Sequence, residues 1–155
     1  MCGYGGRYGY SYINGNVIIN LLGNQNSISR IFGVASAGVE TTLGERKIYL
    51  EYPLTVNELI KLTEITFGKQ SELSVTTAFE LPSTSLTLNI LEPSERIILN
   101  NGLNLIDYTK LKFKFDNELV TVNWTVNGTV KTGDILNSEY KLVSDNGNNL
   151  KLMKK

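Results

Sequence analysis

Four Asn-Gly pairs divide this chain, and they restrict its fold more than any other feature. The pairs stand at residues 14–15, 101–102, 127–128 and 146–147. A two-residue β-hairpin turn of type I′ needs positive φ at both central positions, which asparagine tolerates and glycine prefers. Residues typical of strands flank the last three pairs. These three pairs therefore predict antiparallel hairpins.

The flanking segments define the strands of each hairpin. Leu119 to Val126 alternates strictly and places Trp124 among valines, so we expect Trp124 in the core. Residues 110–115 also alternate, with three lysines on one face. A solvated face or a guarded sheet edge explains this row better than a phosphate site. The other expected pairings are 96–100 with 103–107 and 140–143 with 150–153.

Further strands and one or two helices are expected upstream. The helix signal is a capping box at Thr55–Glu58, followed by an apolar stripe that includes Leu59 and Ile60. Residues 27–35 predict a second short helix. We find no internal sequence repeat of useful period. The expected strands are residues 47–52, 74–81 and 84–91.

These elements predict a mainly β fold. Its expected form is an antiparallel β-sandwich of Ig-like character, with one or two short helices and an N-terminal hairpin arm. Charge is distributed unevenly, with a net +2 in residues 1–39, −5 in 40–95 and +3 in 96–155. This change in charge density predicts a Gly/Tyr-rich arm over 1–39 and a β-sandwich domain over 40–155. One sandwich that includes the first segment remains an alternative.

The residue types needed for most catalysis are missing from the sequence. There is no histidine and only one cysteine, Cys2, which removes the commonest general base and the usual zinc ligand sets. Gly68-Lys69-Gln70 lacks the rest of a P-loop. Paired acids such as Glu92 and Glu95 lie in expected turns rather than across a cleft. We therefore expect no enzyme, no catalytic residues, no cofactor and no metal.

The opening segment, GYGGRYGYSY at residues 3–12, is the best indication of a role. If residues 14–15 form a hairpin turn, three tyrosines share one face with Val17, Ile19 and Leu21. That face could belong to the chain's own core, grip a neighbouring subunit, or stack on nucleic acid, which a single arginine attracts only weakly. The predicted partner-binding residues are Tyr4, Arg7, Tyr8, Tyr10 and Tyr12.

The whole chain resembles the small virion structural proteins of tailed bacteriophages. The features in common are a short Asn-, Ile-, Leu- and Lys-rich β domain, an adhesive N-terminal arm and the lack of a catalytic set. Capsid-decoration, head-fibre and tail-connector proteins are of this style. The resemblance implies a homo-oligomer or larger assembly with capsid or tail proteins as partners. It also implies location in the virion after synthesis in the host cytoplasm.

Other locations and partners are not expected. No succession of basic, apolar and small residues opens the chain, so secretion by a signal peptide is not expected. The richest apolar stretch, residues 17–22, is far too short to span a membrane. The chain is neutral overall, so neither nucleic acid nor an anionic membrane is an expected partner.

The main alternative function is a ligand-binding β module, such as a carbohydrate- or host-surface-binding domain. Modules of this kind usually present several exposed aromatic side chains in a row. After residue 40 the larger aromatic side chains are scattered along the sequence, and Trp124 is expected to be buried. These residues are Tyr49, Tyr52, Tyr108, Trp124 and Tyr140.

Overall fold

The computed structural model describes residues 16–24, 28–33, 44–101, 107–145 and 149–155. These residues form fourteen strands in two sheets and one short 3-10 helix, η1 (Tyr108–Lys110). The expected mainly β, two-sheet fold is therefore confirmed, but its strands are partly parallel and the Ig-like character is not confirmed.

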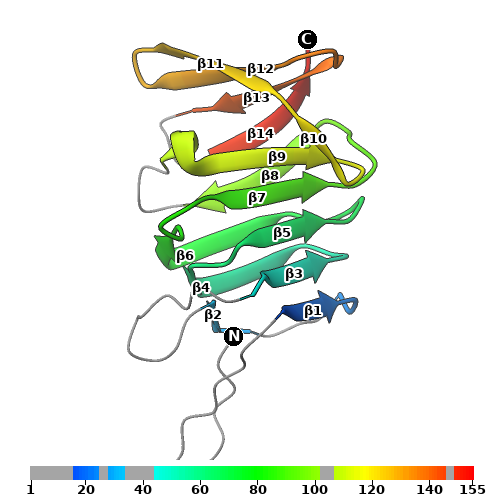
Figure 1. The fold of residues 1–155 in the computed structure, drawn as a ribbon, viewed down its shortest axis with the longest axis vertical. Helices are drawn as coiled ribbons and strands as arrows, with labels where there is room; N and C mark the ends of the chain where they lie inside the picture. The colour runs from blue at the N-terminus through cyan, green and yellow to red at the C-terminus, as the bar shows by residue number, and fades with distance from the viewer. Residues whose placement is uncertain (1–15, 25–27, 34–43, 102–106, 146–148) are drawn as a thin grey trace, which may run out of the picture.

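The two sheets lie face to face and contain six and eight strands (Figure 1). In spatial order, the first contains β1 (Val17–Leu21), β3 (Arg46–Leu50), β5 (Glu64–Phe67), β7 (Leu86–Ile90), β9 (Leu111–Phe115) and β10 (Glu118–Val120). The second contains β11 (Val122–Asn127), β12 (Val130–Ile135), β13 (Tyr140–Ser144), β14 (Asn149–Lys154), β8 (Arg96–Asn101), β6 (Leu73–Glu80), β4 (Leu54–Ile60) and β2 (Arg30–Phe32).

From β1 to β9 the chain winds in successive, regularly stacked turns of strands, which we call the coil. Consecutive strands alternate between the two sheets, and each strand pairs in parallel with the strand two places further along. Figure 1 shows the resulting rungs stacked from β1 at one end towards the β11–β12 hairpin at the other. This is the arrangement of a two-sheeted β-solenoid, in which each rung contacts mainly its neighbours.

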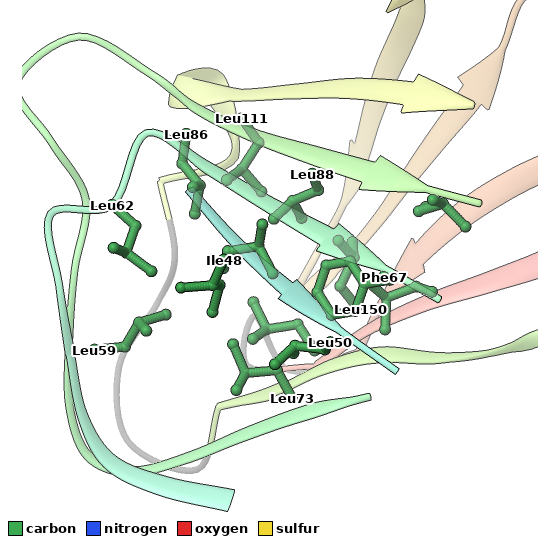
Figure 2. Packing of buried hydrophobic residues seen from close by; sticks show 14 of the residues in the cluster. Ile48, Leu50, Leu59, Leu62, Phe67, Leu73, Leu86, Leu88, Leu111 and Leu150 are labelled. Carbon is green, nitrogen blue, oxygen red and sulfur yellow. The ribbon is translucent and has the colours of Figure 1, made fainter. Parts of the chain in front are cut away.

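Aligned apolar side chains fill the space between the sheets. One row of the first sheet runs through Ile19, Ile48, Ile65, Leu88 and Phe113, which are register partners on successive strands. The last four are at most 1% exposed. Figure 2 shows two of them, Ile48 and Leu88, within the cluster of buried apolar side chains between the sheets. Full burial of a side chain of this size contributes about 1.5–3 kcal/mol, so these rows hold the coil together.

The helix predicted from the capping box at Thr55–Glu58 is wrong, because Leu54–Ile60 forms strand β4. The register of β4 against β6 shifts between Val56 and Glu58, as it does at a β-bulge. On the other side of β4, the amides of Asn57 and Glu58 both donate to the carbonyl of Ser29. This bulge on the β2 side of β4 spaces the buried Val56, Leu59 and Ile60 as they would be on one face of a helix, which explains the error.

The second predicted helix, residues 27–35, is also contradicted where it is described. Within residues 28–33 the structure has strand β2, which pairs in parallel with residues 58–60 of β4. Only Ile31 of this strand is buried, since β2 forms the outer edge of its sheet. A strand of three residues is stabilised mainly by pairing with its neighbour. It is also too short to produce a recognisable hydrophobic period in the sequence.

Of the predicted hairpins, two are confirmed. β11 and β12 pair around the third Asn-Gly, with Asn127 opposite Val130, so the turn residues are Gly128 and Thr129 rather than Asn127 and Gly128. β13 and β14 pair across the fourth Asn-Gly, which itself lies outside the described residues. The first Asn-Gly, at 14–15, also lies outside them.

The hairpin predicted around residues 101–102 is wrong. Strand β8 already has β6 on one side and β14 on the other, so neither edge is free for residues 103–107. Antiparallel pairing is confined to the final part of the chain, where β14 joins β8 and the hairpins from β9 to β14 complete the two sheets.

The predicted division at residue 39 remains a prediction. Strands β1 and β2 precede it, yet they belong to the same two sheets as the strands that follow. Any independent arm must therefore lie before Val17.

Candidate functional site

The predicted partner-binding residues Tyr4, Arg7, Tyr8, Tyr10 and Tyr12 lie outside the described residues. The structure does describe the surface next to them, which is the end of the coil formed by β1 and β2. We call this surface the first rung. The geometry of the first rung indicates which contacts can form at this end of the coil.

Strand β1 ends the six-stranded sheet and has one edge without a partner among the described strands. The Val17 amide donates to Glu45 of the next rung at 2.8 Å, and the Leu21 carbonyl accepts from Glu51 at 3.1 Å. Because backbone groups alternate in direction along a parallel strand, those of Ile18 and Asn20 point to the free edge. Such an edge can pair with a further strand.

The side chains of the first rung are unusually apolar and poorly covered. Ile18 begins an outward-facing row that continues with Lys47, Glu64, Thr87 and Lys112, and it is the only apolar member. Ile18 and the neighbouring Leu22 are each 62% exposed. On the inner face, Ile19 and Leu21 contact the core but are only partly buried. The first rung therefore leaves the end of the core accessible.

A group of charges stabilises the outer face of the first sheet. Glu64 on β5, only 10% exposed in its side chain, lies 3.5 Å from the Lys47 ammonium on β3 and 3.1 Å from that of Lys114 on β9. The pairs join three different rungs. The row of lysines that the sequence predicts over residues 110–115 is thus partly an ion-pair face, since Lys114 pairs with Glu64 and only Lys112 of the three is exposed.

The Tyr49 hydroxyl on the same face donates a hydrogen bond to the Glu51 carboxylate. This bond, together with partial burial and the nearby charges of Glu51 and Glu92, raises the pKa of Tyr49 to about 12. Because the phenol is held neutral, it acts here as a structural donor and is not activated for proton transfer.

A second candidate site is an open pocket of about 410 Å³ at the other end of the coil. It lies where the chain leaves β10 and crosses to the opposite sheet as β11. Its aromatic side chains are Tyr108, Phe113 and Trp124. The Tyr108 and Trp124 ring centroids are 5.1 Å apart and those of Phe113 and Trp124 are 6.2 Å apart, within the usual range for aromatic contacts.

Two lysines lie at this pocket. Lys112 lines it, and the Lys131 ammonium lies 4.5 Å from the centroid of the Tyr108 ring. The nearby acid is Asp107, which accepts hydrogen bonds from the amide and hydroxyl of Thr109. These bonds, chiefly that from the hydroxyl, lower the pKa of Asp107, and the charges of Lys110 and Lys131 lower it further.

The sequence did not reveal this pocket. Tyr108 and Trp124 are sixteen positions apart, and the alternation of Trp124 with valines indicated full burial. Trp124 is in fact only partly buried, because β11 is the edge of its sheet and no strand lies beyond it in the described part of the chain.

Within the residues that the structure describes, no three or more Cys, Asp or Glu side chains gather as a metal site would require. The same residues contain no helix long and apolar enough to span a membrane. Comparison with known proteins found no matching family model, no similar curated protein and no similar solved structure.

Proposed function

We propose that this chain is a non-catalytic structural protein of a multi-subunit assembly, docking on neighbouring subunits through its N-terminal segment and first rung. Within that class we propose a component of a tailed-phage virion, such as a capsid-decoration, head-fibre or tail protein. The single observation that carries the docking proposal is the edge of β1 that has no partner among the described strands, with Ile18 exposed beside it.

Two features of the first rung support this role. An edge strand whose backbone groups are unpaired can add a strand from another subunit, which supplies affinity through main-chain hydrogen bonds. An apolar residue in an otherwise polar row gives that contact an apolar centre, as interfaces generally have. The tyrosines of the adjoining segment would add rigid aromatic area.

The substitution Ile18→Glu tests the proposal directly. The introduced carboxylate would stand opposite Lys47, forming an oppositely charged cross-strand pair, so the isolated subunit should keep its fold. A carboxylate buried between subunits would weaken self-association or binding to the partner at least about tenfold. The measurement is the dissociation constant for assembly by analytical ultracentrifugation.

The matched control is Leu136→Glu, because Leu136 is also an exposed apolar residue, at 50%, but follows β12 at a distance from β1. It should assemble as the wild type does. Equal assembly of wild type and Ile18→Glu would contradict docking through the first rung.

A further inference from the structure

The aromatic pocket beside β11 has no role in the docking of the first rung. We propose that it binds one acidic pyranose ring, such as a uronic acid unit of a glycan. Its volume of about 410 Å³ lies in the range of small-molecule sites and suits a single sugar ring.

The walls of the pocket suit the two faces of a sugar. A pyranose has an apolar face of C–H groups, which can pack against the rings of Tyr108 and Trp124. Its hydroxyl groups need hydrogen-bond partners, and Thr109 and Thr121 are among the lining residues. The Thr109 hydroxyl donates to Asp107 and can still accept a hydrogen bond.

The charge around the pocket selects an acidic sugar over a neutral one. Lys112 lines the pocket and Lys131 contacts Tyr108, whereas the acid near them is Asp107, which also feels the charge of Lys110. Asp107 is engaged by Thr109 and by the charges of Lys110 and Lys131. A carboxylate on the ligand would therefore find an excess of ammonium groups.

The single tryptophan makes the pocket directly observable, because all tryptophan fluorescence comes from Trp124. Full-length protein is titrated with sodium glucuronate and, separately, with glucose, at constant ionic strength adjusted with sodium chloride. We expect a saturable fluorescence change with glucuronate, with a dissociation constant on the order of 1 mM for a ligand of this size. Glucose should bind at least about fivefold more weakly.

Two variants that each remove one lysine charge test whether glucuronate binds in this pocket. Lys112→Gln should weaken glucuronate binding about fivefold without unfolding the protein, because Lys112 is exposed. The control Lys69→Gln removes a lysine that is 71% exposed and belongs to the β5–β6 connection, and should change nothing. The proposal is overturned if glucuronate gives no saturable change, if glucose binds equally well, or if Lys112→Gln binds glucuronate as the wild type does.

Discussion

At the scale of single residues, Gly133 on β12 leaves the space that β11 needs for its larger side chains. A Cβ atom added at Gly133 would lie 2.6 Å from Val122 Cγ1 and 3.1 Å from the Trp124 ring. Trp124 is the register partner of Gly133, so the two positions are complementary in volume. The position of the pocket wall therefore depends on this glycine.

We expect Gly133→Ala to lower the free energy of unfolding by about 1–3 kcal/mol, since it over-packs a filled space. It should also shift the fluorescence of Trp124. Gly128→Ala is the matched control, because nothing lies within 4 Å of its added Cβ and its cost, ~1 kcal/mol, comes from a φ of +62°. Urea unfolding followed by fluorescence distinguishes them. An unshifted Trp124 spectrum in Gly133→Ala would contradict the proposed packing.

Tyr49 predicts a dependence of stability on alkaline pH. Its folded-state pKa is about 12, above the ordinary value of 10, because its hydroxyl donates to Glu51. The stability contributed by this raised pKa is fully present below pH 10 and is lost as the pH rises through about 12. We therefore expect the wild type to lose more unfolding free energy between pH 10 and 12 than Tyr49→Phe does. Parallel losses in urea titrations of the two proteins would show that Tyr49 is not held neutral.

At the scale of elements, the sequence predicts the pairing of strands that are adjacent in the chain better than the pairing of strands that are distant in it. The β11–β12 and β13–β14 hairpins could be predicted, because a turn and its two strands are adjacent in the chain. The β9–β10 turn at Asp116 and Asn117, both with positive φ, also joins strands that are adjacent in the chain. Neighbouring turn chemistry sets the register of such pairs.

The parallel rungs could not be predicted in this way. Ile48, Ile65, Leu88 and Phe113 are partners across successive rungs, yet 17, 23 and 25 residues separate them. Connections of unequal length hide the repeat from any search at a fixed period. The bulge of β4 against Ser29 added a helical spacing where the structure has a strand.

The same distinction applies to the candidate sites. The opening tyrosines stood out because they are concentrated in one segment, and their role remains a prediction. The aromatic pocket combines residues from η1, β9 and β11, which come together only through the crossing between sheets.

Ion pairs between rungs give an element-scale prediction. Glu64→Gln removes the charge shared by Lys47 and Lys114 while keeping the size of the side chain. Because Glu64 is nearly buried, we expect a loss of about 1–3 kcal/mol in the free energy of unfolding. The control is Glu58→Gln, whose partner Arg30 is 63% exposed, with an expected loss below about 1 kcal/mol. Equal losses in urea unfolding would argue against the three-rung group.

At the scale of the whole molecule, the two ends of the coil differ in how completely their core is covered. The hairpins from β10 to β14 continue both sheets beyond β9, and their side chains cover the core at that end. At the other end, β1 and β2 are the last described strands, and Ile19 and Leu21 are only partly covered. Solenoids need both ends covered to remain soluble as separate units. The first rung is thus where a further segment or subunit would bind.

The central claim is that residues 1–15 and the first rung join this chain to other subunits. The most direct test is the mass in solution, by light scattering, of the full chain and of a chain that begins at residue 16. That boundary retains β1 and β2 in their sheets. We predict a defined oligomer for the full chain and a folded monomer for the shortened one, checked by circular dichroism. A monomeric full chain whose shortened form unfolds would contradict the account, because the tyrosines would then complete the chain's own core.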